Sequence, residues 1–183
     1  MVKYKKYLQE ETKKDLGFID YTDFAEDEFA DARLAFATGS KFCLSVVAND
    51  GFPIHSKKEV AFAGRSNVGK SSLINSVTNV SGLARVSNTP GRTQMINFFS
   101  QGDAFFIVDL PGFGYAKASK ESIKQWSQLT RDYLLGRKEL ETVFFLIDSR
   151  HGIKEIDENI MEILDKSAVS YQVILTKFDK IKK

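Results

Sequence analysis

Gly64-Arg65-Ser66-Asn67-Val68-Gly69-Lys70-Ser71 is the stretch of this chain that decides its fold. It follows a short apolar run at 60–63 and precedes a helical pattern of apolar residues, so the expected order is strand, loop and helix. A glycine-framed loop that leads into a helix directs several backbone N–H groups and the positive end of the helix dipole at one point. A polyphosphate bound there gains several charge-assisted hydrogen bonds. Lys70 would neutralise the outer phosphates, and the hydroxyl of Ser71 would ligate magnesium.

The composition favours a single folded domain in the cytoplasm. The chain has 183 residues, of which 43% are apolar and 27% charged; a domain of this size buries roughly 70% of its unfolded surface. No apolar stretch approaches membrane-spanning length, and the N-terminal sequence MVKYKKYLQEE lacks the apolar core of a secretory signal, so we expect no membrane contact. The formal net charge of +2 gives no reason to expect DNA as a partner.

The chain divides into an N-terminal segment, 1–56, and a second region, 57–183. The N-terminal segment is predicted to hold a helix at about 22–36 and a first strand at 41–47. In that strand Cys43 lies between apolar residues, so we expect it to be a small core residue. His55 and His151 lack the clustering of a metal site and are interpreted as surface or turn residues.

Short apolar runs in the second region lack the polar alternation of half-exposed strands, which predicts parallel strands covered on both faces. They are 60–63, 105–108, 143–147 and 173–175, with helical patterns between them at about 123–136 and 156–164. The fold class is therefore α/β, with an open sheet. Ligands of such sheets bind beyond the carboxyl ends of the strands, where the runs are followed by Gly64, Asp109, Asp148 and Thr176.

Asp109-Leu110-Pro111-Gly112 follows the second apolar run and adds to the phosphate site. An acid at the end of a buried strand can hold the water shell of magnesium, and the N–H of Gly112 can contact a terminal phosphate. The turn-rich stretch 88–94 offers the hydroxyl of Thr93, which would complete the magnesium sphere when a third phosphate is present.

Thr176-Lys177-Phe178-Asp179 follows the last apolar run and predicts the choice of base. An aspartate can accept hydrogen bonds from the N1–H and exocyclic amine of guanine, and adenine offers no such pair of donors. Lys177 can lie along the plane of the base. The sequence therefore favours GTP over ATP, and an ATP kinase or ATPase is the weaker alternative.

Five strings of the sequence resemble the EngB GTPases of bacteria, a family of the TrmE-Era-EngA-EngB-septin type. They are EVAFAGRSNVGKSSLIN, SNTPGRTQMINFF, DLPGFGYAK, LIDSRHGIKEID and TKFDK, and the resemblance runs from about Lys57 onward. It implies a P-loop NTPase G domain, with a mostly parallel sheet flanked by helices on both faces. It also implies a GTP/GDP-binding switch in assembly of the large ribosomal subunit, linked to cell division and septation, and a monomer.

The resemblance implies a set of site residues. The nucleotide would contact Gly64, Arg65, Ser66, Asn67, Val68, Gly69, Lys70, Ser71, Ser72, Gly91, Arg92, Thr93, Gln94, Met95, Asp109, Leu110, Pro111, Gly112, Thr176, Lys177, Phe178 and Asp179. Lys70, Thr93, Gly112 and Asn67 would serve catalysis. Magnesium would be ligated by Ser71 and Thr93 and held through water by Asp109.

Two residues bear on hydrolysis. Phe113 stands where Ras-like GTPases carry the glutamine that orients the attacking water, so intrinsic turnover should be slow without an activator. Asn67 stands where related GTPases use a loop asparagine to help hold potassium, which would stabilise charge between the phosphates. The alternative is that Asn67 is a loop residue bonding its own backbone.

The family pattern continues beyond the base-reading motif with a further strand, a base-contacting loop and a closing helix, whereas this chain ends at Lys183. We therefore expect the last strand and helix to be missing, one sheet edge to be uncovered, and nucleotide binding to be weakened. Two alternatives to a ribosomal GTPase remain: a GTP-binding interaction protein in division, and a truncated remnant with little hydrolysis.

Overall fold

The computed structural model describes residues 26–85, 95–113 and 120–181 of this chain. The chain forms two compact units, Met1–Ala37 and Thr38–Lys183. In the first unit the predicted helix is present as α2, Glu26–Ala37; residues 22–25 of that prediction lie outside the described residues. The division of the sequence at residue 56 stays a prediction. Among the described residues, no helix has the length and apolar character needed to cross a membrane.

The second unit is built on one sheet of six strands in the order β1-β3-β4-β2-β5-β6. The strands are β1 (Ser40–Val46), β2 (Lys58–Gly64), β3 (Ile96–Gln101), β4 (Phe105–Asp109), β5 (Leu140–Asp148) and β6 (Tyr171–Thr176). The pairs β2·β4, β2·β5 and β5·β6 are parallel, and β1·β3 and β3·β4 are antiparallel. The predicted mostly parallel α/β sheet is therefore confirmed.

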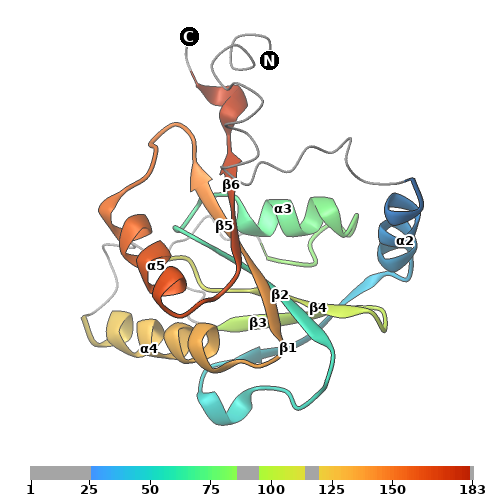
Figure 1. Ribbon diagram of the computed structural model, residues 1–183, viewed down its shortest axis with the longest axis horizontal. Coiled ribbons are helices and arrows are strands. Elements are labelled where there is room, and N and C mark those ends of the chain that lie inside the picture. The colour runs from blue at the N-terminus through green and yellow to red at the C-terminus, as the bar shows by residue number, and fades with distance from the viewer. Residues whose placement is uncertain (1–25, 86–94, 114–119, 182–183) are drawn as a thin grey trace. The chain divides into compact units, whose positions relative to one another are not determined.

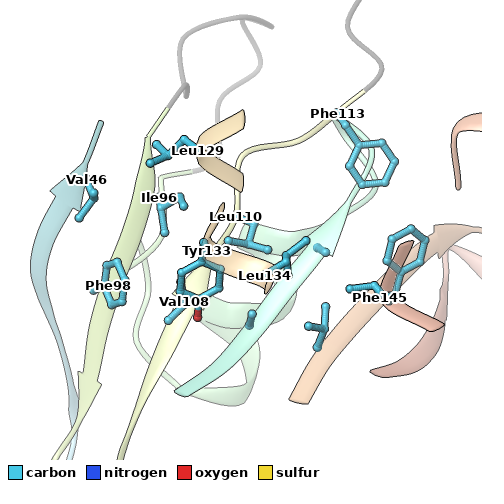
Figure 2. Packing of buried hydrophobic residues seen from close by; sticks show 14 of the residues in the cluster. Val46, Ile96, Phe98, Val108, Leu110, Phe113, Leu129, Tyr133, Leu134 and Phe145 are labelled. Atoms are coloured by element: carbon cyan, nitrogen blue, oxygen red, sulfur yellow. The ribbon is translucent and has the colours of Figure 1, made fainter. Parts of the chain in front are cut away.

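Helices cover both faces of this sheet. In Figure 1, α3 (Lys70–Val77) lies on one face, and α4 (Lys120–Gly136) and α5 (Glu155–Lys166) lie on the other. The core beneath α4 and α5 joins Tyr133 and Leu164 to side chains from five strands, among them Phe98 and Phe145 (Figure 2). The apolar runs 60–63, 105–108 and 143–147 form inner strands of the sheet, because apolar side chains on both faces of these strands are covered.

Strand β3 was not predicted from the sequence, because Asn97, Ser100 and Gln101 interrupt its apolar residues. Its polar side chains face β1, where Ser45 Oγ donates to Asn97 Oδ1 at 2.6 Å and Ser40 Oγ donates to Gln101 Oε1. Polar residues are tolerated in this strand because the neighbouring strand supplies their partners.

The prediction of Cys43 as a core residue is wrong. Cys43 is exposed, and the pairing of β1 with β3 shifts register between Phe42 and Leu44, so that Cys43 lies in a bulge. A bulge in a strand at the sheet edge turns the extra residue out of the ladder. Neighbouring apolar residues gave no indication of this irregularity.

The prediction that both faces of 173–175 are covered is also wrong. Strand β6 is an edge of the sheet; Val173 is 41% exposed and Leu175 61% exposed. Val169, just before β6, and Tyr171, its first residue, pack against the core. The second half of β6 therefore presents apolar side chains to solvent among the described residues.

A buried polar cluster lies at the amino-terminal end of β2, and it corrects the interpretation of His55 as a surface or turn residue. Glu59 is fully buried; its carboxylate accepts hydrogen bonds from Tyr133 Oη at 2.8 Å and from Arg137 Nε at 2.9 Å and Nη2 at 2.6 Å. His55 Nε2 lies 3.1 Å from the same carboxylate, and its ring stacks on Phe106 with centroids 4.3 Å apart. His151, by contrast, lies in an exposed turn as predicted.

Candidate functional site

The loop between β2 and α3 has the glycine geometry that its sequence predicts. Gly64 has φ +150°, and a Cβ there would lie 2.7 Å from Leu146 O and 2.9 Å from Val68 Cγ1. No other residue fits that space without a backbone shift. The loop ends at Gly69, whose left-handed backbone begins α3 at Lys70. The first N–H groups of α3 and its positive dipole end are thus directed at the loop.

Lys70 is a buried cation at this helix start, with 8% of its surface exposed. Among the described residues, Lys70 Nζ donates a hydrogen bond to Gly64 O at 3.3 Å. Burial lowers the pKa of Lys70, and the charge of Asp109 partly opposes that change. A buried ammonium with so few partners gains free energy from any anion that enters the loop.

Asp109 ends β4 next to the loop, and its carboxylate is also incompletely paired. Burial raises the pKa of Asp109 to about 6, against the charge of Lys70 and a hydrogen bond with Ser71. Within the described ranges, Oδ1 of Asp109 is buried and has no hydrogen-bond partner. Buried polar atoms of folded proteins nearly always have a partner, so this oxygen marks a site for an absent ligand.

The segment after Asp109 lies directly against the phosphate loop. Ser66 N donates to Phe113 O at 3.0 Å, Phe113 N donates to Gly64 O at 3.4 Å, and Ser66 Oγ donates to Gly112 O at 3.3 Å. A Cβ on Gly112 would lie 2.8 Å from Ser66 Cα. The approach of the two backbones therefore requires glycine at position 112.

Phe113 points into the core. The residue is 6% exposed, and its ring stacks on Phe145 with centroids 5.7 Å apart and planes inclined by 27°. Figure 2 shows the two rings together. A buried phenyl group has no polar atom with which to orient a nucleophile.

The turn that follows β6 is tied to the phosphate loop by two side chains. Thr176 Oγ1 donates to Val68 O at 2.8 Å and lies 3.2 Å from Ile147 O. Lys177 has a left-handed backbone with φ 56°, and its Nζ donates to Asn67 O and to Asp148 Oδ2, the latter at 3.0 Å. Phe178 and Asp179 are exposed in the short helix η3, Phe178–Lys180. The predicted phosphate loop and the predicted base-reading turn are thus held side by side.

Known proteins share this arrangement. Residues 59–177 match a family described as 50S ribosome-binding GTPase. A probable GTP-binding protein EngB of Ruegeria sp. (strain TM1040) is 57% identical over 150 residues, which are 82% of this chain and 69% of the relative.

The chain belongs to the EngB family of GTP-binding proteins.

Solved structures agree with this assignment. A crystal structure of a probable GTP-binding protein EngB aligns with 68% of this chain, over 73% of the length of the solved chain, with a TM-score of 0.55 and 27% identity. A structure of Era in complex with MgGDPNP and 16S ribosomal RNA covers 70% of this chain and 43% of its own, with a TM-score of 0.52 and 27% identity. The P-loop GTPase fold predicted from the sequence is confirmed.

The structure brings three of the four predicted EngB contact stretches together: Gly64–Ser72, Asp109–Gly112 and Thr176–Asp179. Of the fourth stretch, Gly91, Arg92, Thr93 and Gln94 lie outside the described residues, and Met95 is described just before β3. Thr176 uses its hydroxyl to hold the phosphate loop. Asn67 has a left-handed backbone with φ 62°, a conformation that asparagine tolerates better than most residues.

A guanine nucleotide with magnesium fits the residues present. Asp109 Oδ1, which has no partner among the described residues, and the adjacent Ser71 hydroxyl offer oxygen atoms to magnesium, and the buried Lys70 offers a cation to phosphate. No cluster of three or more His, Cys, Asp or Glu suited to a metal occurs in the described part of the chain. Such a sparse set is typical of magnesium that takes much of its coordination from phosphates and water.

Asp148 and Arg150 are two polar residues of this region to which the sequence assigned no role. Both Arg150 Nε, at 2.9 Å, and Arg150 Nη2, at 2.7 Å, donate to the Asp148 carboxylate. The position of Asp148 after an apolar run was the one available signal. Its contact with Lys177, 29 residues away in the sequence, was not evident.

Proposed function

We propose that this chain is a GTP-binding switch and slow GTPase that acts in assembly of the large ribosomal subunit. The observation that carries the proposal is that Lys70 and Asp109 are buried at the start of α3 with Ser71 next to them, and that Asp109 Oδ1 has no hydrogen-bond partner among the described residues. A triphosphate with magnesium would satisfy all three groups, because it brings both negative oxygens and a cation.

Each residue of the site has a role in this proposal. Lys70 neutralises the outer phosphates, and the backbone of Gly64–Gly69 donates to them. Ser71 and Thr93 ligate magnesium, which neutralises charge that develops on the phosphates, and Asp109 orients the bound water. The N–H of Gly112 contacts the terminal phosphate. Asp179 accepts hydrogen bonds from guanine, and Lys177 lies along the base.

Hydrolysis is proposed to be slow. The burial of Phe113 supports this, because its phenyl ring has no polar atom that could orient the attacking water. Asn67 is proposed to help hold a potassium ion between the phosphates, and its exposed position in the loop is compatible with that role. Equal hydrolysis rates in potassium and sodium, with and without ribosomal subunits, would contradict the potassium role.

The ribosomal role rests on family membership. The matching family is described as ribosome-binding, and Era is solved with ribosomal RNA. We propose that GTP and magnesium order 88–97 and 109–117, which then dock on the large subunit, and that hydrolysis releases the cytoplasmic, monomeric protein. The basic residues Arg85, Arg92, Lys117, Lys120 and Lys124 would contact RNA phosphates there.

A second candidate is a GTP-binding interaction protein in division and septation that needs no hydrolysis. The buried Phe113 favours it, since binding does not require a positioned water. A variant blocked in hydrolysis that still supports normal septation would favour this candidate over the first.

Nucleotide binding and cosedimentation test the proposal. GTP and GDP should bind well above ATP and ADP, and Lys70→Met should lower GTP affinity about 100-fold, since it removes charge-assisted hydrogen bonds to phosphate. Cosedimentation with large ribosomal subunits should require GTP. Equal binding of GTP and ATP would overturn the choice of base, and cosedimentation independent of the nucleotide would overturn the switch.

A further inference from the structure

Asp148 is a buried carboxylate at the end of β5, beside Thr176 in the register of β5 and β6. Its side chain is 9% exposed. It accepts hydrogen bonds from the side chain and the backbone N–H of Arg150, the latter at 3.1 Å, and from Lys177 Nζ. These bonds, led by that of the Arg150 side chain, hold the pKa of Asp148 well below its usual range. Asp148 therefore carries its negative charge at neutral pH.

Lys177 connects this carboxylate to the phosphate loop. Its ammonium donates to Asp148 Oδ2 and to the backbone carbonyl of Asn67, and its side chain is 23% exposed. Two acceptors on different elements restrict the long, flexible lysine side chain to one path. The path runs from the base-reading turn to the loop that holds the phosphates.

Arg150 is hydrogen-bonded to one carboxylate and attracted by the charge of a second. Its pKa is raised first by the hydrogen bond with Asp148 and also by the charge of Asp179, the residue that would bind the guanine edge. The guanidinium is held on Asp148 through two of its nitrogens, which fixes its orientation. Its positive charge thus acts on Asp179 from a fixed position.

We propose that Asp148 and Arg150 are positioning residues for guanine recognition. Asp148 anchors Lys177 across the phosphate loop, and Arg150 keeps Asp148 in place and orients the carboxylate of Asp179. The inference rests on the proposed function, because it assumes that Thr176–Asp179 bind guanine. A turn held in its binding geometry loses less conformational entropy when the nucleotide arrives, which raises affinity.

A double-mutant cycle between Asp148 and Lys177 tests the anchoring. Asp148→Asn removes the charge at nearly constant shape and should lower GDP affinity about tenfold, because a hydrogen bond to a charged group is lost. Lys177→Met should lower it by a similar factor. Asp148→Asn in the Lys177→Met background should lower the affinity by much less than tenfold, since its partner Lys177 is already absent and only the bond to Arg150 remains to be weakened. Full additivity of the two losses would overturn the anchoring.

A comparison of GDP with IDP tests the role of Arg150. IDP lacks the exocyclic amine, so the ratio of the two affinities reports how well Asp179 is oriented toward that amine. Arg150→Met should reduce the preference for GDP at least threefold, and Arg150→Lys should restore part of it, because a positive charge returns. Equal losses for GDP and IDP would show only a structural role and would overturn the orientation of Asp179 by Arg150.

Controls separate this inference from the function on which it rests. Glu162→Gln alters an exposed ion pair with Lys166 on α5 and should leave both nucleotide affinities unchanged. The urea midpoint without nucleotide reports folding; if Asp148→Asn fails to fold, the variants Lys177→Met and Arg150→Met carry the test. No preference of the unaltered chain for GDP over ADP would overturn the proposed function itself. A clear preference that Asp148→Asn and Arg150→Met leave intact would overturn only the positioning roles.

Discussion

A buried carboxylate lies at each end of the central strands, and Glu59 and Asp109 differ in how completely they are hydrogen-bonded. Glu59, at the start of β2, receives hydrogen bonds from Tyr133 and Arg137 and lies beside His55. Asp109, at the end of β4, keeps one oxygen without a partner in the described part of the chain and has a pKa raised to about 6. A buried carboxylate whose oxygens have hydrogen-bond partners stabilises the fold. A buried carboxylate with an oxygen left without a partner can gain free energy when a ligand binds to it.

Removing Glu59 should give the largest effect. Glu59→Ala should lower the free energy of unfolding by about 3–5 kcal/mol, because Arg137 is left as a largely buried charge without its main partner. Urea denaturation of the nucleotide-free protein measures this loss. Glu162→Ala, at an exposed ion pair, is the matched control and should show no measurable change. If the two variants are equally stable, the cluster at the start of β2 has no structural role.

Asp109 should behave in the opposite way. An acid whose pKa is raised on folding stabilises the fold below its unfolded pKa of 3.8, and that contribution disappears as pH rises through about 6. The shift corresponds to about 3 kcal/mol. Without nucleotide and magnesium, Asp109→Asn should therefore match the unaltered chain near pH 4 and become the more stable of the two by pH 7. Urea midpoints across this range measure the difference; a variant that is less stable at pH 7 contradicts the comparison.

A smaller test removes one donor from the saturated cluster. Tyr133→Phe deletes the hydroxyl that donates to Glu59 at 2.8 Å and should cost about 1–2 kcal/mol, because one carboxylate oxygen loses a buried partner. GDP affinity, measured in parallel by titration calorimetry, should stay unchanged, since the cluster lies at the other end of the strands. A weakened GDP affinity at unchanged stability would mean that the two ends are coupled.

The sequence predicts well which residues lie at the carboxyl end of the sheet, because the patterns that place them are local in the chain. Apolar runs mark the parallel strands, and Gly64, Asp109 and Thr176 follow such runs directly. Parallel strands bring these ends together whatever the rest of the chain does. A short motif therefore suffices to place each residue.

The sequence does not predict the other end, because its contacts are made across the fold. Glu59 and Arg137 are 78 residues apart and resemble ordinary surface charges when each is viewed alone. The same reason explains why β3 and the contact of Asp148 with Lys177 were not predicted, and why the bulge at Cys43 was missed. Each depends on which strand is the neighbour, and local pattern carries no such information.

The backbone contact between Ser66 and Phe113 allows hydrogen exchange to report how often this part of the site opens. Their two N–H groups donate across the junction of the phosphate loop and the segment after Asp109, at 3.0 Å and 3.4 Å. An amide exchanges its hydrogen with solvent only when such a bond opens. Deuterium uptake at these two amides would therefore count the openings of the junction directly. Ser66, with the shorter bond, and Phe113, with the longer one, provide two independent exchange rates for the opening of the same junction.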